Sequence, residues 1–203
     1  MVAIIDYDAG NIKSVEKAIE KLGREAVITR DPDAIVSADH VVLPGVGNFG
    51  DAMQNLTRYG MDAVIRDLVR FRKPLLGICV GMQLLFEGSE ESPDVPGLGI
   101  LKGRCCRFPE KEGFKIPQIG WNALHPLNGG DLFFGIPGGT YVYFVHSYYC
   151  EADQPEEVRA VAEYTKIFHA SVQRGPLVAT QFHPEKSGDA GLRILKNFLE
   201  MES

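Results

Sequence analysis

The first 80 residues alternate short, continuous apolar runs with segments whose apolar residues recur at helical spacing, and this alternation constrains the fold most. The apolar runs are Val2–Ile5, Ala26–Thr29, His40–Leu43 and the run from Pro74 to Ile78. The helical segments between them are Ile12–Leu22, Phe49–Leu56 and Met61–Phe71. Uninterrupted apolar strands are typical of sheets that are covered on both faces. The pattern therefore predicts an α/β fold with a mostly parallel sheet flanked by helices.

The second half of the chain has a different pattern, in which short β-rich segments follow one another between turn residues. These segments are Gly99–Phe108, Pro117–Leu124, Thr140–Cys150, Arg159–Tyr164, Ile167–Gln173 and Leu177–Gln181. They predict an antiparallel β extension, either added to the first sheet or forming a small second one. Ala190–Met201 predicts a final helix. Because 203 residues suit one well-buried core and no linker interrupts them, we expect one domain over 1–203.

Composition excludes several classes of function. A net charge of −6 argues against nucleic acid or an anionic membrane as the main partner. Four cysteines without a C-x-x-C pair predict neither a metal site nor a disulfide framework, which favours a reducing, cytoplasmic setting. The amino-terminal apolar run is too short for a signal peptide, and no run approaches a membrane span. We expect a cytoplasmic protein without metal or cofactor.

Cys79 has the sequence setting of a nucleophile. It is framed by Gly77 and Gly81 at the transition from an apolar strand to a helix that carries Met82, Leu85 and Phe86 on its apolar side. Glycines allow a sharp turn and leave the sulfur uncovered, as in a nucleophile elbow. The amino end of the helix would favour the thiolate. The alternative is an inert, buried cysteine.

His183 is the strongest candidate for the base that serves Cys79. It follows an apolar strand, and Pro184 favours an extended backbone, so His183 and Glu185 are expected to point the same way. Glu185 would then accept the Nδ1 proton of His183 and orient Nε2 toward the thiol. The alternative is a loop that caps the last helix through Glu185 and Ser187.

Acyl transfer also needs hydrogen-bond donors for an oxyanion. Pro44-Gly45-Val46-Gly47 offers backbone N–H groups of Val46 and Gly47 that are little obstructed by side chains. The N–H of Val80, directly after the nucleophile, would be a further donor. By itself, Pro-Gly-x-Gly could equally be an ordinary β-turn.

Together these motifs resemble the class I, triad-type glutamine amidotransferases. The resemblance is carried by Leu75–Phe86 around Cys79, by Leu43–Phe49 and by Gln181–Ser187. Within that family the chain is most similar to the glutaminase subunits of imidazole glycerol phosphate synthases. The supporting stretches are Ile5–Ser14, Ile119–Asn122 and Tyr143–Tyr148, so the similarity runs from residue 4 to about 188. It implies a flavodoxin-like sheet.

The resemblance also implies roles for individual residues. Cys79, His183 and Glu185 would form the catalytic triad, and L-glutamine would be the nitrogen donor. Gln83 would hold the α-amino acid end of glutamine, and the remaining implied substrate-binding residues are Gly45, Gly47, Ser147 and Tyr148. From the sequence alone, Gln83 could also be an exposed helix residue, and Ser147-Tyr148 could serve only strand-end packing.

The implied reaction is hydrolysis of glutamine to glutamate and ammonia through a Cys79 thioester. The implied partner is a separate (β/α)₈ cyclase subunit, which forms a heterodimer with the glutaminase and takes the ammonia through a channel. The cyclase converts PRFAR to imidazole glycerol phosphate and AICAR in L-histidine biosynthesis. Implied interface residues are Asn11, Trp121, Tyr143 and Lys186, although core packing, helix capping or solvation could account for each.

Two other functions remain open at this point. The chain could be a glutaminase for another synthase, such as pyridoxal phosphate synthase or anthranilate synthase. It could also be a catalytically silent subunit that senses glutamine, although a pure binder needs no nucleophile. For the active enzyme, we expect the Gly45–Gly47 loop to rest with a carbonyl facing the site until a partner and acceptor turn it.

Overall fold

The computed structural model describes residues 1–127 and 131–202. The helices are α1 (Ile12–Lys21), α2 (Pro32–Ser37), α3 (Phe49–Arg58), α4 (Met61–Arg70), α5 (Val80–Leu84) and α6 (Gly188–Leu199), with 3₁₀ turns η1 (Asp131–Phe133), η2 (Pro155–Glu157) and η3 (Pro184–Lys186). The first strands are β1 (Val2–Ile5), β2 (Ala26–Thr29), β3 (His40–Leu43) and β4 (Leu75–Ile78). The later strands are β5 (Gly103–Arg107), β6 (Gln118–Pro126), β7 (Thr140–His146), β8 (Tyr148–Ala152), β9 (Val158–Glu163), β10 (Ile167–Arg174) and β11 (Leu177–Thr180).

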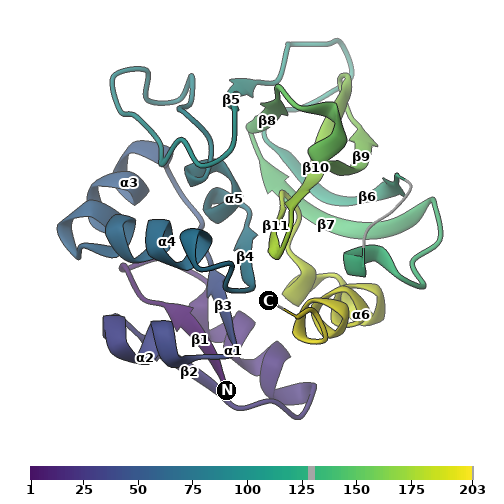
Figure 1. Ribbon diagram of the computed structural model, residues 1–203. Coiled ribbons are helices and arrows are strands. Elements are labelled where there is room, and N and C mark those ends of the chain that lie inside the picture. Colours follow the sequence, from purple (N-terminus) through teal and green to yellow (C-terminus); the bar gives the residue numbers. More distant parts are fainter. Residues whose placement is uncertain (128–130, 203) are drawn as a thin grey trace.

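The parallel half of the sheet has the order β2-β1-β3-β4-β11. Every residue of β1, β4 and β11 is buried, as expected for apolar strands covered on both faces. Helices α2 and α3 both pack against α4, whereas α1 and α6 both contact η3, so the helices form two groups around the sheet (Figure 1). The predicted α/β architecture is confirmed.

The antiparallel half continues the same sheet. From β11 the order runs β10-β9-β6-β7, and β8 pairs with both β10 and β5 (Figure 1). Of the two arrangements left open by the sequence, the added strands are therefore the correct one. This half places β7 next to η3, because the backbone N–H of His183 donates to the Tyr143 carbonyl at 2.9 Å.

Several local predictions were wrong or incomplete. The turn residues Asp31-Pro32-Asp33 predict a break between elements, but this segment begins α2. The Asp31 side chain accepts from the N–H of Asp33, and Pro32 occupies the first helical turn. The segment Thr140–Cys150 forms two strands rather than one, separated at Ser147. There β7 leaves its partner β6, and β8 joins β5 and β10.

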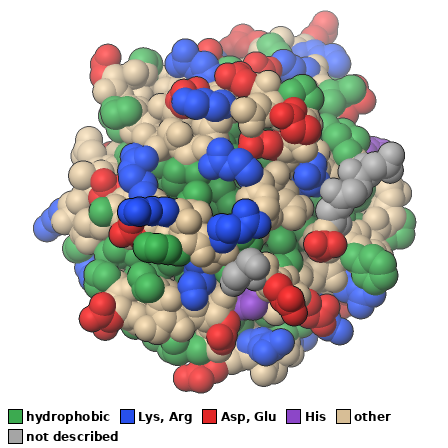
Figure 2. All heavy atoms as spheres, in the orientation of Figure 1, with side chains coloured by type: hydrophobic (Ala, Val, Ile, Leu, Met, Phe, Trp, Pro, Cys, Tyr) green, Lys and Arg blue, Asp and Glu red, His purple; other side chains and the backbone are tan. Residues whose placement is uncertain are grey.

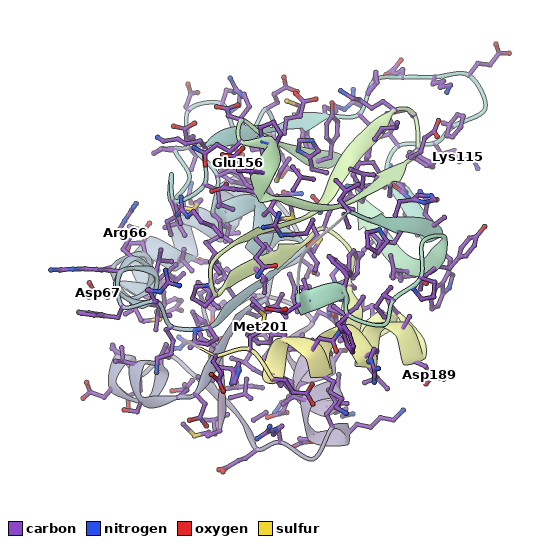
Figure 3. The ribbon with its side chains drawn as sticks, turned by 45° about the vertical axis from the view of Figure 1, so that its right-hand side comes forward. Arg66, Asp67, Lys115, Glu156, Asp189 and Met201 are labelled. Atoms are coloured by element: carbon purple, nitrogen blue, oxygen red, sulfur yellow. The ribbon has the colours of Figure 1, made fainter. Side chains whose placement is uncertain are left out.

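Basic and acidic side chains are mixed on the surface, as expected for a chain that contains many of both. On the face shown in Figure 2, Lys and Arg side chains are interspersed with acidic and hydrophobic ones. Arg66 and Asp67 lie on the exposed side of α4 (Figure 3), while Ile65 and Leu68 of the same helix are buried. Within the described ranges, no helix combines the length and apolar character needed to cross a membrane.

Candidate active site

Cys79 lies at a sharp turn between β4 and α5. Its backbone has φ 54° and ψ −110°, a conformation that a non-glycine residue rarely adopts and that is typical of a nucleophile elbow. A Cβ on Gly81 would lie 2.0 Å from the Leu43 carbonyl oxygen, and a Cβ on Gly77 would lie 3.0 Å from the Gly81 oxygen. The flanking glycines are therefore required because the elbow packs directly against β3 and against itself.

The helix after the elbow is shorter than predicted. It ends at Leu84, because the Leu84 carbonyl accepts from the N–H of Leu98 at 2.8 Å, so that Leu85 and Phe86 follow it as buried residues of a turn. With only five residues, α5 has no long helix dipole to direct at the thiol, and N–H groups of its first turn are already bonded to backbone carbonyls. The N–H groups of Met82 and Gln83 return to the Cys79 carbonyl.

His183 and Glu185 form a buried pair next to Cys79. The Nδ1 of His183 lies 2.7 Å from Oε1 of Glu185, and both side chains are fully buried. The expected contact is present, and His183 itself has the expected extended backbone, with φ −98° and ψ 96°. The extended conformation does not continue, because Pro184 to Lys186 form η3, which carries Glu185 back beneath the imidazole. The side-chain amide of Asn11 also donates to Glu185 Oε1.

The surroundings of His183 favour its protonated form. Burial by itself lowers the pKa of His183, but the neighbouring Cys79 sulfur and the Glu185 carboxylate outweigh it and raise the pKa to about 10. Nε2 of His183 is buried and has no conventional hydrogen-bond partner among the described residues, which leaves it directed toward the sulfur. The imidazolium form of His183 therefore faces the Cys79 sulfur at neutral pH.

A cavity of about 200 Å³ opens over Cys79. The residues that line it come from the loop after β3, from the elbow and from the β7–β8 junction. They are Val46, Gly47, Cys79, Val80, Gln83, Glu91, Pro117, Val145, His146, Ser147 and Tyr148. Most of these were singled out from the sequence, although they lie far apart along the chain.

The loop after β3 has a carbonyl turned toward the elbow. The Gly45 carbonyl accepts from the N–H of Val80 at 3.3 Å, so one of the expected oxyanion donors is already engaged. The Tyr7 hydroxyl donates to the Pro44 carbonyl at 2.6 Å and holds the start of this loop. A Cβ on Gly45 would lie 2.6 Å from that hydroxyl oxygen, so only glycine fits this position without displacing its neighbours.

The family comparison identifies the scaffold. The family profile described as "Glutamine amidotransferase class-I" matches residues 3–201. The chain belongs to the class-I glutamine amidotransferases. As an amidotransferase of this class it has glutaminase activity, and the α/β sheet with its antiparallel extension is the fold of that family.

Relatives of this amidotransferase share one name. Subunit HisH of imidazole glycerol phosphate synthase from Moorella thermoacetica is 50% identical over 200 residues, covering 98% of this chain and 94% of that one. The HisH subunit from Dehalococcoides mccartyi (strain CBDB1) is 48% identical over 201 residues, covering 99% and 97%. Among solved structures, a glutamine amidotransferase has TM-score 0.77 at 22% identity, and PurLQS from Thermotoga maritima has 0.76 at 19%. These structures share the fold.

The candidate substrate-binding residues of the amidotransferase surround the cavity. Gln83 is 3% exposed, so it is not the surface helix residue that the sequence left open. Its amide nitrogen donates to the Tyr148 carbonyl at 3.2 Å. Ser147 and Tyr148 line the cavity, while the Ser147 carbonyl is bonded to the N–H of Phe108. Gly47 also lines the cavity, whereas Gly45 does not and packs against Tyr7 and Gly81.

The candidate interface residues lie close together near the triad. Trp121 and Tyr143 are directly paired across β6 and β7 with their rings 6.2 Å apart, and the Lys186 ammonium lies 6.0 Å from the Tyr143 ring. Trp121 is 55% exposed, which excludes a core role. Asn11 occupies the N-cap position of α1 but makes no capping bond there, because its side chain reaches Glu185 instead.

Two further residues of the site escaped the sequence reasoning. Glu91 lines the cavity, with its carboxylate held by the N–H of Phe49 at 2.7 Å. It lies in Ser89–Gly99, whose Glu, Pro and Gly residues predict only an exposed connection, and no pattern distinguishes Glu91 from its acidic neighbours. Gln181 is fully buried and its amide nitrogen lies 3.7 Å from the Cys79 sulfur. A polar residue between an apolar strand and His183 was the available signal.

Proposed function

We propose that this amidotransferase is the glutaminase subunit of an imidazole glycerol phosphate synthase, with Cys79 as its nucleophile. The observation that carries the proposal is the assembly of Cys79, His183 and Glu185 beneath a cavity that suits an amino acid. The HisH name of relatives that match along almost their whole length supports the choice of synthase, and it does not favour pyridoxal phosphate synthase. A cytoplasmic location, where the four free thiols stay reduced, belongs to the same proposal.

The cavity offers complementary groups for both ends of glutamine. The α-ammonium group of glutamine would face the Glu91 carboxylate and Oε1 of Gln83, because the Gln83 NH₂ group is already bonded to the Tyr148 carbonyl and to Gln181. The α-carboxylate would accept N–H donors around Ser147 and Tyr148. Val46 and Gly47 would line the substrate side chain, and Gly45 lies behind them against Tyr7 and Val80. The γ-carboxamide would then reach the Cys79 sulfur.

In the first step the Cys79 thiolate attacks the γ-carboxamide carbon and forms a tetrahedral oxyanion. The N–H groups of Val80 and of Val46 or Gly47 are the proposed donors to this oxyanion. As the carbon–nitrogen bond breaks, the His183 imidazolium gives its Nε2 proton to the departing nitrogen, which leaves as ammonia. A glutamyl thioester and a neutral His183 remain.

In the second step water hydrolyses the thioester. The neutral His183 takes a proton from the water as its oxygen attacks the carbonyl carbon. Collapse of the second tetrahedral intermediate breaks the carbon–sulfur bond, releases glutamate and restores the thiolate. Glu185, bonded to Nδ1 at 2.7 Å, keeps the imidazole oriented through both steps.

Ammonia would pass to a (β/α)₈ cyclase subunit that forms a heterodimer with this chain. Exposed apolar side chains on β6 and β7 support this face as the interface: Ile119 is 64% exposed, Trp121 55% and Tyr141 61%. Tyr143, Lys186 and Asn11 continue it toward the triad. The cyclase would use the ammonia to convert PRFAR to imidazole glycerol phosphate and AICAR.

Docking would also control the oxyanion site. While the Gly45 carbonyl is bonded to the Val80 N–H, that donor cannot reach an oxyanion. Rotation of the Gly45–Val46 peptide would free Val80 and present the Val46 N–H. We therefore expect the isolated chain to hydrolyse glutamine more slowly than the complex with cyclase and acceptor ligand, and equal rates would contradict this coupling.

The proposal is tested with Cys79→Ala in the complex with the cyclase. We expect loss of glutamine-dependent synthesis, whereas synthesis from added ammonium persists because the cyclase needs no nucleophile from this chain. Loss of both activities would point to a structural role for Cys79. Labelling of wild-type Cys79 by an electrophilic glutamine analogue provides an independent check, and absence of labelling in the liganded complex would favour a silent subunit.

A further inference from the structure

Gln181 contacts the nucleophile directly although it lies outside the triad. It connects β11 to His183, and its side chain is 0% exposed. Its amide nitrogen lies 3.7 Å from the Cys79 sulfur, across 102 positions of sequence. The backbone N–H of Gln181 donates to the Ala170 carbonyl at 2.9 Å, which fixes the residue to β10. The backbone bond to β10 and the buried side-chain contact with Gln83 together keep the amide next to the sulfur.

The hydrogen bonds around Gln181 determine which end of its amide faces Cys79. The Tyr148 carbonyl can only accept, so Gln83 must direct its NH₂ group there. The same nitrogen lies 3.2 Å from Gln181 Oε1 and donates its second hydrogen to that oxygen. The oxygen of Gln181 is thereby assigned to Gln83, which leaves its NH₂ group for the sulfur.

The two uncharged partners of the Cys79 sulfur favour opposite protonation states. The Val145 carbonyl, 3.9 Å away, accepts a hydrogen bond and therefore favours the thiol. The Gln181 amide, at 3.7 Å, donates one and therefore favours the thiolate. Unlike His183, the amide has no proton to lose, so its influence persists when His183 transfers its proton to the leaving group.

Other titratable groups near the sulfur in the described chain do not replace this donor. They are His183 and Glu185 of the triad, Tyr7 from the loop after β1, Cys150 of β8, and the cavity-lining Glu91 and His146. Burial raises the pKa of Tyr7 and of Cys150 and lowers the pKa of His146 to about 4, so these three are uncharged at neutral pH. His183 is the cation and Gln181 the neutral donor.

We propose that Gln181 is a positioning residue that stabilises the Cys79 thiolate through its N–H and ties the nucleophile to Gln83. This inference rests on the proposed function, in which Cys79 attacks glutamine and Gln83 holds the other end of the substrate. The chain Tyr148–Gln83–Gln181–Cys79 sets the distance between these two ends. Loss of the amide affects both the protonation of the nucleophile and its alignment.

Gln181→Met tests this, because methionine keeps the length and loses the N–H donor. The readout is the pH dependence of alkylation of Cys79 by iodoacetamide in the complex, followed on the Cys79 peptide because Cys105, Cys106 and Cys150 are also free thiols. We expect the midpoint of the profile to move about one pH unit upward, and the rate at pH values below both midpoints to fall about tenfold. In glutaminase assays kcat should fall more than KM rises.

Asn197→Leu is the matched control. Asn197 is a buried amide of α6 that bonds the Leu132 and Phe134 carbonyls, and it is absent from the cavity lining. Its loss should lower the melting temperature without moving the alkylation profile. If Gln181→Met lowers the melting temperature but keeps the wild-type profile, Gln181 is merely structural and the inference is wrong.

Two further arms separate the remaining outcomes. If the methionine variant does not fold, Gln181→Leu repeats the experiment, with the same profiles supporting or overturning the inference. Failure of the proposed function would appear in the wild type, as Cys79 that reacts with iodoacetamide but not with an electrophilic glutamine analogue. Failure of this inference alone would appear as normal analogue labelling together with an unshifted profile in the variant.

Discussion

Glu185→Gln separates the charge of the triad carboxylate from its geometry. In the structure, Oε1 of Glu185 accepts from both His183 Nδ1 and the Asn11 amide. Oε2 is buried and has no hydrogen-bond partner among the described residues. A glutamine at this position would keep its oxygen toward the two donors and place its NH₂ where Oε2 now lies. The imidazole would therefore keep its tautomer and lose only the neighbouring negative charge.

The size of this effect follows from the hydrogen bond that remains. A hydrogen bond to a charged group contributes about 1.5–3 kcal/mol and a neutral one about 0.5–1.5 kcal/mol, so the imidazolium loses about 1–1.5 kcal/mol. This corresponds to about one unit in the pKa of His183, and to a thioester hydrolysis about tenfold slower, because that is the step in which the imidazolium forms. Because that pKa is about 10 in the wild type, His183 stays protonated at pH 7. Glu185→Ala, which leaves the buried Nδ1–H of His183 unpaired, should lower the rate about 10³–10⁴-fold.

The assay is the pH profile of glutamate release by the complex. The wild type should lose activity as pH rises through the pKa of His183, because the imidazolium that protonates ammonia disappears. In Glu185→Gln that alkaline limb should move about one unit toward neutral pH, with kcat at pH 7 down about tenfold. If Glu185→Gln is as inactive as Glu185→Ala, or if the limb does not move, the reasoning is wrong. Asn11→Ala is the control, because Asn11 also donates to Oε1 of Glu185. The double variant with Glu185→Gln should lose more activity than the losses of the two single variants combined.

Two further predictions concern stability and the partner. Burial lowers the pKa of His146 from 6.5 to about 4, so between these pH values the unfolded chain binds a proton at this residue and the folded chain does not. We expect the free energy of unfolding of the wild type to fall by about 3 kcal/mol between pH 6.5 and 4, as measured by urea unfolding. The fall should be smaller in His146→Gln. A parallel fall in both proteins would contradict this. Trp121→Ala should leave the melting temperature of the isolated chain within about 1 °C, because the ring is 55% exposed, and weaken cyclase binding by tenfold or more in calorimetry, about 1.4 kcal/mol; unchanged affinity would remove Trp121 from the interface.

The parallel half of the fold was predictable because its strands are buried on both faces. Strands such as β1 and β4 are read from continuous apolar runs, and their boundaries agree with the structure. The start of α2 was missed for a physical reason: Asp31-Pro32 is both turn chemistry and an N-cap followed by proline. Only the packing of Ile35 into the core distinguishes the two.

The site was predictable where its chemistry is local and unpredictable where it depends on long-range contacts. The elbow at Cys79 is encoded by adjacent glycines, and the bond between His183 and Glu185 joins residues two positions apart. His183 itself is extended, as predicted, but η3 and not a continued extended segment delivers the carboxylate. Gln181 and Glu91 gain their roles only when distant segments fold onto the elbow, and no spacing in the sequence reveals that.

The two halves of the site differ in readiness, and this difference locates its control. The half that holds the nucleophile and its proton donor is assembled, since His183 is already bonded to Glu185. The half that must receive the oxyanion is not, since the Val80 N–H is bonded to the Gly45 carbonyl at 3.3 Å. A single long backbone hydrogen bond contributes only about 1 kcal/mol, so one peptide rotation is enough to switch this half. A partner docked on the proposed interface at Trp121 and Tyr143 would therefore need only a small difference in binding free energy between the two peptide orientations to activate the enzyme. Specificity would be gained because the nucleophile itself would not have to move.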